Sequence, residues 1–146
     1  MFTFRLQSLL DARIACEERA VSEVSTAVGR LIREQEILQG LRNERSVLGG
    51  QLKALQGSPT RALDLSLLIA HLWRCHDHEK EQENLIEGIQ RDLDMKREEL
   101  LAAVKDRKIM ENLKMRHLEQ YRDHIDDMER KDLDEIAITR FGRSER

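Results

Sequence analysis

Apolar residues spaced alternately three and four apart run along nearly the whole chain, and only one strong helix break interrupts them. This spacing places apolar side chains on one stripe of a helix. The break is Gln56-Gly57-Ser58-Pro59-Thr60: glycine ends helices, proline begins them, and Ser58 or Thr60 can cap the next one. A weaker break, Gly49-Gly50, either begins the turn or is a weak point in a continuous helix, and we favour a turn zone at about 49–60.

Composition agrees with two long helices. Half of the 146 residues are Ala, Glu, Lys, Leu or Arg, which is typical of coiled coils. Three Phe, one Tyr and one Trp supply too little bulk for a compact globular core. We therefore predict an all-α fold, a long antiparallel two-helix coiled-coil hairpin. It forms a single domain over 1–146, with helix 1 at about 5–56 and helix 2 at about 60–140.

The predicted arms are unequal, so the second helix should overhang the first. With a turn centred near residue 58, Phe4 is expected near Asn112, and everything beyond about residue 115 should lack an intramolecular partner. An unpaired apolar stripe on a soluble helix usually contacts another chain. The stripe of this overhang consists of Leu118, Tyr121, Ile125, Met128, Leu133 and Ile136.

Charge and motifs exclude several function classes. The net charge is −3 with both signs interleaved, so nucleic acid is not an expected partner. No apolar run approaches a membrane span, no signal peptide is evident, and Cys16 and Cys75 do not suggest a disulfide framework, so we expect a cytoplasmic protein. The seven glycines form no phosphate-binding loop. We predict no enzyme activity and no cofactor.

One cluster resembles a metal site. On a helix, His71, Cys75 and His78 share one face, and they could hold zinc with Asp77 or a water as the fourth ligand. Alternatively, Cys75 is a small residue of the apolar seam and the histidines beside it lie in solvent. Because structural zinc sites usually use tighter, cysteine-rich spacings, we favour the second interpretation and predict no metal site.

Three stretches resemble the FliJ family of flagellar export proteins. They are Phe2-x-Phe4-x-Leu6-x-x-Leu9-Leu10-x-x-Arg13, then Asp106-Arg107-Lys108-x-x-Glu111-x-Leu113-Lys114, and last Glu129-x-Lys131-x-Leu133-Asp134-Glu135-Ile136-Ala137. Their order along the chain, the chain length, the short turn and the longer second arm also fit that family.

The resemblance implies a coiled-coil component of the flagellar type III export apparatus. Such a protein would dock onto the hexameric export ATPase and link it to the membrane export gate and to export chaperones, at the inner face of the cell membrane. The implied contacts with the ATPase ring are Phe4, Leu9, Leu10, Arg13, Leu133 and Ile136. The candidate contacts with the export gate are Leu68, Leu72 and Trp73.

Two other functions remain open from the sequence. A central-stalk subunit of a rotary ATPase is also a long hairpin, but many such stalks carry a sizeable insertion where this chain has only a short turn. A generic homodimerising scaffold would instead pair the overhang with a second copy of itself. Sedimentation before and after removal of the overhang separates self-association from docking onto other proteins.

Overall fold

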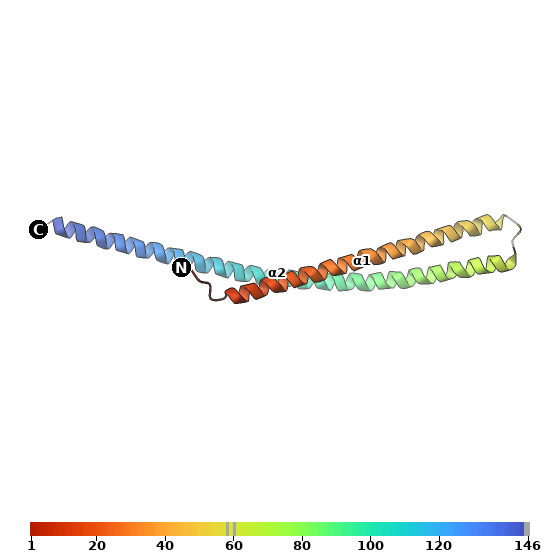
Figure 1. Ribbon diagram of the computed structural model, residues 1–146, viewed down its shortest axis with the longest axis horizontal. Helices are drawn as coiled ribbons and strands as arrows, with labels where there is room; N and C mark the ends of the chain where they lie inside the picture. The colour runs from red at the N-terminus through yellow and green to blue at the C-terminus, as the bar shows by residue number, and fades with distance from the viewer. Residues whose placement is uncertain (58, 60, 145–146) are drawn as a thin grey trace. The chain divides into compact units, whose positions relative to one another are not determined.

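A computed structural model describes residues 1–57, 59 and 61–144, and these form two long helices. Helix α1 spans Gln7–Gln56 and helix α2 spans Ala62–Ser144, with 50 and 83 residues (Figure 1). The predicted all-α hairpin with a longer second arm is therefore confirmed. The two candidate capping residues, Ser58 and Thr60, lie outside the described residues.

The turn is shorter than the glycines suggested. Gly49 and Gly50 lie inside α1, which continues to Gln56, so the expected turn at about 49–60 begins too early. A glycine costs a helix interior about 1 kcal/mol relative to alanine. The apolar seam continues through this region, because Leu48 is buried and Leu52 is half-buried. Packing on both sides of the glycine pair outweighs the cost of the pair itself.

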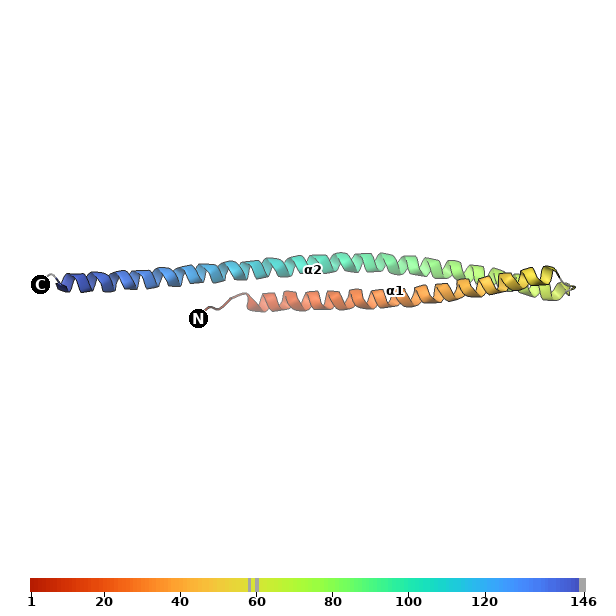
Figure 2. The same cartoon turned by 90° about the horizontal axis from the view of Figure 1, so that it is seen from above.

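The chain divides into two compact units, each of which pairs part of α1 with part of α2. Unit 1 comprises Met1–Glu18 and Leu101–Arg146, and unit 2 comprises Arg19–Leu100. In unit 2 the two helices lie side by side in both views (Figures 1 and 2). The buried apolar residues of unit 2 are Ala27, Leu38, Leu48, Cys75, Ile89 and Leu93.

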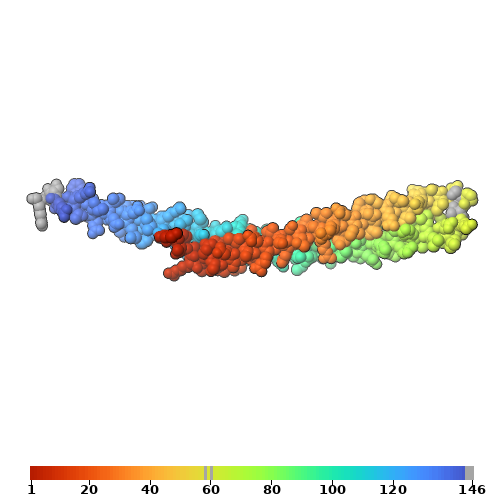
Figure 3. Space-filling model, in the orientation of Figure 1, coloured from red at the N-terminus to blue at the C-terminus, as the bar shows by residue number. Residues whose placement is uncertain are grey.

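Residues that precede α1 pack against α2 in unit 1. Phe4, Leu10 and Met110 form its buried cluster, and Phe2, Ile14 and Leu113 pack against that cluster. The ring of Phe4 meets His117 edge-on at 5.7 Å, and the ring of Phe2 lies 5.7 Å from Tyr121. Figure 3 shows this N-terminal segment against α2.

The N-terminal segment reaches further along α2 than expected. Phe4 lies close to the expected Asn112, in the cluster with Met110 and Leu113, and its ring also contacts His117. Phe2 reaches Tyr121, so the uncovered part of α2 begins after Tyr121 and not at about residue 115. The reason is geometric. Residues 1–6 are not helical, and an extended chain can span up to about 3.3 Å per residue, whereas a helix rises about 1.5 Å.

Candidate functional site

The far end of α2 presents an apolar strip to solvent. Every residue from 126 to 143 is exposed. Within that segment Met128, Leu133 and Ile136 are 48%, 66% and 51% exposed, and we call these three residues the terminal strip. Helical spacing puts Met128 on the same side of α2 as the half-buried Tyr121 and Ile125, whereas Leu133, five residues after Met128, lies about 140° further around the helix, beside Ile136. Through Met128 the strip continues the stripe that unit 1 covers, and through Leu133 and Ile136 it extends around the uncovered part of the helix.

Charged side chains surround the terminal strip. The segment from 122 to 135 contains seven acidic and three basic residues. Two further large apolar residues, Ile138 and Phe141, are 73% and 77% exposed beyond the strip. An apolar strip with a charged margin is the usual composition of a protein-binding surface.

The six candidate contacts with an ATPase ring are not equally available. Phe4 and Leu10 are only 8% and 4% exposed because they pack against Met110, so they hold unit 1 together and are not free to dock. Arg13 pairs with Asp106 at 3.3 Å. The remaining three, Leu9, Leu133 and Ile136, are exposed.

In the second stretch that resembles the family, residues 106–114, charged side chains form ion pairs and hydrogen bonds within unit 1. Arg107 binds Glu17 of α1 through Nε and Glu111 through Nη1, the latter at 2.6 Å. These hydrogen bonds, with Glu111 before Glu17, raise the pKa of Arg107. Lys114 Nζ donates to Gln7 Oε1 at 2.8 Å. Three residues of this stretch, Asp106, Arg107 and Lys114, thus hold α1 against α2, a role that spacing along one helix does not reveal.

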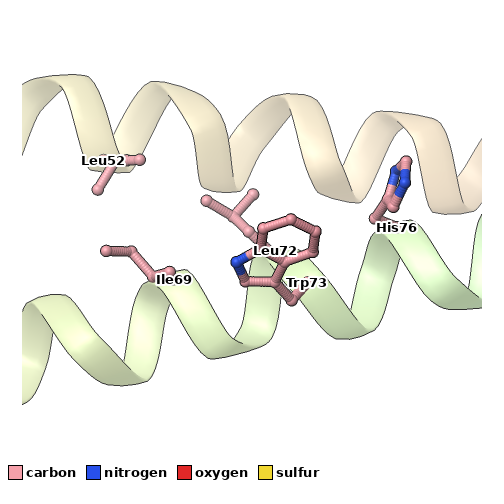
Figure 4. A pocket seen from close by; sticks show the side chains of 5 residues that line it. All are labelled: Leu52, Ile69, Leu72, Trp73 and His76. Atoms are coloured by element: carbon pink, nitrogen blue, oxygen red, sulfur yellow. The ribbon is translucent and has the colours of Figure 1, made fainter.

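The candidate gate residues lie beside a shallow apolar pocket in unit 2. Leu72 and Trp73 line it, together with Leu52, Ile69 and His76 (Figure 4). Trp73 is 64% exposed and meets His76 edge-on at 6.2 Å, whereas Leu68 is half-buried and does not line the pocket. Sequence reasoning missed Ile69, although it lies four residues before Trp73 on the same face. It also missed Leu52, because that residue comes from the other helix.

The candidate metal residues are placed differently from the prediction. His71 and Cys75 lie close together, but His78 is exposed and is not part of their cluster. Glu44 of α1 completes the group: the ligand atoms of Glu44, His71 and Cys75 all lie within 4.8 Å of one another. Burial, followed by the charges of Glu44 and Glu79, raises the pKa of the Cys75 thiol.

Neither helix contains, within the residues that the structure describes, a stretch long and apolar enough to cross a bilayer. The chain as a whole matches one protein-family model, described as Flagellar FliJ protein, over residues 1–146. The match includes all three stretches that suggested the resemblance. No curated protein and no solved structure matches the chain.

Proposed function

The chain belongs to the FliJ family, and on that premise we propose that it docks onto the hexameric flagellar export ATPase through the terminal strip of α2. Membership makes it a coiled-coil protein associated with flagellar export, in a family of non-enzymatic export components. That family assignment favours export over a rotary-ATPase stalk.

The observation that carries the docking proposal is the exposure of Met128, Leu133 and Ile136. A partner that covers these side chains gains on the order of 1–2 kcal/mol from each, because each is about half exposed or more. The acidic residues around them attract a basic surface, which raises the association rate more than the affinity. Leu9 is an additional exposed contact on the N-terminal part of unit 1.

The pocket of unit 2 supports a second contact of the same protein. We propose that Trp73, with Leu72 and Leu68, binds the membrane export gate. An exposed tryptophan beside an apolar pocket is a common interface anchor. Gate binding would hold the chain peripherally at the inner face of the cell membrane, and export chaperones would be its third class of partner.

The docking proposal is tested with the purified chain and the export ATPase of the same organism. We expect the chain to promote assembly of the ATPase ring and to raise ATP hydrolysis. The variant Leu133→Ala/Ile136→Ala should lose this stimulation. Leu101→Ala/Ile109→Ala is a matched control in the same unit, because those residues are 61% and 64% exposed outside the strip. A strip variant as active as the wild type would contradict the proposal.

Self-association is the competing use of the same strip. Sedimentation of the full chain alone, and of a chain that ends at Tyr121, distinguishes the two. We expect a monomer in both cases and a loss of ATPase stimulation only on truncation. A dimer that dissociates on truncation would instead show that the strip binds its own copy, as in the homodimerising scaffold.

Gate binding is tested separately with the cytoplasmic domain of the gate protein. Trp73→Ala should weaken its capture by the chain without affecting ATPase stimulation. Leu63→Ala is a matched control, because Leu63 is 68% exposed on the same helix and does not line the pocket. Equal weakening by both variants would argue against Trp73 as a specific anchor.

A further inference from the structure

Three side chains of different chemistry converge in unit 2, from both helices. His71 and Cys75 lie one turn apart on α2, and Glu44 reaches them from α1. His71 Nε2 and Glu44 Oε1 are 3.3 Å apart, and the Cys75 sulfur lies within 4.8 Å of both ligand atoms. Nitrogen, sulfur and carboxylate oxygen are the three donor types that bind zinc in proteins.

More negative charge lies around this cluster than is usual in a buried apolar seam. Cys75 is 3% exposed, and Glu79, one turn further along α2, is 4% exposed. Glu79 Oε2 pairs with Arg45 at 3.0 Å, but Glu79 Oε1 has no hydrogen-bond partner among the residues described. A buried carboxylate oxygen without a partner is costly, and a nearby cation reduces that cost.

We propose that Glu44, His71 and Cys75 bind a zinc ion that joins α1 to α2 within unit 2. Neighbouring ligand atoms of a tetrahedral zinc lie roughly 3.3–3.6 Å apart, given bond lengths of about 2.0–2.3 Å. The His71–Glu44 pair already has that separation, and the Cys75 sulfur, within 4.8 Å of both ligand atoms, moves closer when the metal binds. A water molecule takes the fourth position.

Binding changes the protonation of Cys75. The Cys75 thiol releases its proton to solvent and binds as a thiolate, and His71 binds as the neutral imidazole. The negative charges of Glu44 and Glu79, which disfavour the thiolate when no metal is bound, then favour the cation. Zinc should stabilise the paired helices, because it binds the folded chain and its ligands come from both helices. This proposal is independent of docking onto the ATPase.

The experiment uses the full chain, reduced and freed of metal, then dialysed against zinc and analysed by elemental mass spectrometry. We expect one zinc per chain and a higher midpoint of thermal unfolding. Cobalt(II) in place of zinc should give a sulfur-to-metal charge-transfer band and tetrahedral d–d bands. Cys75→Ser, His71→Gln and Glu44→Gln should each abolish stoichiometric binding and the cobalt bands.

Two matched controls separate the site from adventitious binding. Cys16→Ser removes the other thiol, and His78→Gln removes the exposed histidine on the same helix. Both should retain one zinc per chain. Glu44→Gln keeps the proposal falsifiable if Cys75→Ser fails to fold, because Glu44 is exposed. No zinc in the wild-type chain, one zinc per chain retained in Glu44→Gln, or zinc lost in His78→Gln would each overturn the site.

Discussion

Arg45 of α1 holds Glu79 of α2 at 3.0 Å, and the two side chains differ greatly in exposure. The Glu79 side chain is 5% exposed, whereas the Arg45 side chain is 46% exposed. The charge of the buried carboxylate is therefore compensated by an arginine that is itself about half exposed to solvent. Such a pair adds little net stability, because the cost of burying the carboxylate offsets much of its attraction to the arginine.

Removing only the arginine should destabilise unit 2. We expect Arg45→Leu to lower the free energy of unfolding by about 1–3 kcal/mol, less than for a fully buried pair because solvent screens Arg45. The double variant Arg45→Leu/Glu79→Leu should recover most of this loss, since it removes both charges. Urea denaturation measures both. A double variant as unstable as Arg45→Leu alone would show that the unpaired carboxylate is not the cause.

Alkaline pH should destabilise the chain through Cys75. Burial, and then Glu44 and Glu79, raise the pKa of this thiol in the folded chain above its unfolded value. Below the ordinary thiol pKa of about 8.5 the group is neutral in both states. As the pH rises further, the unfolded chain loses the proton first, so the free energy of unfolding falls.

The measurement compares metal-free wild-type and variant chains by thermal unfolding at about pH 7.5 and 9.5. Cys75→Ala should remove part of the alkaline loss, whereas Cys16→Ala should not, because Cys16 is exposed. Equal alkaline losses in wild type and Cys75→Ala would mean that the thiol does not contribute.

The two helices could be predicted from the sequence because the information for them is local. The 3/4 spacing of apolar residues and the Gly-Ser-Pro break each lie within a few neighbouring residues. Gly49-Gly50 was misleading because helix propensity is a weak preference that packing of Leu48 and Leu52 overrides.

Contacts between helices could be predicted less well. Spacing along one helix brings His71 together with Cys75, but Glu44 completes their cluster from α1, and His78 does not. The partner depends on the exact offset between the helices, and a turn located only to within several residues leaves that offset open. The same uncertainty placed the start of the overhang at about residue 115, when the contact of Phe2 extends the covered part to Tyr121.

Replacing the glycine pair by alanine should stabilise the chain. Gly49 and Gly50 lie in a helix, and an added Cβ at either position meets nothing within 4 Å. We therefore expect Gly49→Ala/Gly50→Ala to raise the free energy of unfolding by about 1–2 kcal/mol. Urea denaturation measures the gain. A loss of stability would mean that this part of α1 needs glycine for a reason other than space.

Two leucines of α2 should respond very differently to the same substitution. Leu93 is 1% exposed in unit 2, so Leu93→Ala should cost about 2–4 kcal/mol. Leu133 is 66% exposed, so Leu133→Ala should change the free energy of unfolding by less than about 0.5 kcal/mol. Thermal unfolding of both variants tests this. A large loss for Leu133→Ala would show that the chain already uses the terminal strip in its own stability.

The segment from 126 to 143 keeps its helical form with every side chain in water. An unpaired helical stretch has little stability beyond that of its own hydrogen bonds, because most helical stability in proteins comes from packing of an apolar face. Its amide hydrogens should therefore exchange with solvent far faster than those around Leu93, without any opening of the paired helices. This end of α2 can unwind and rewind repeatedly while the remainder of the molecule stays folded.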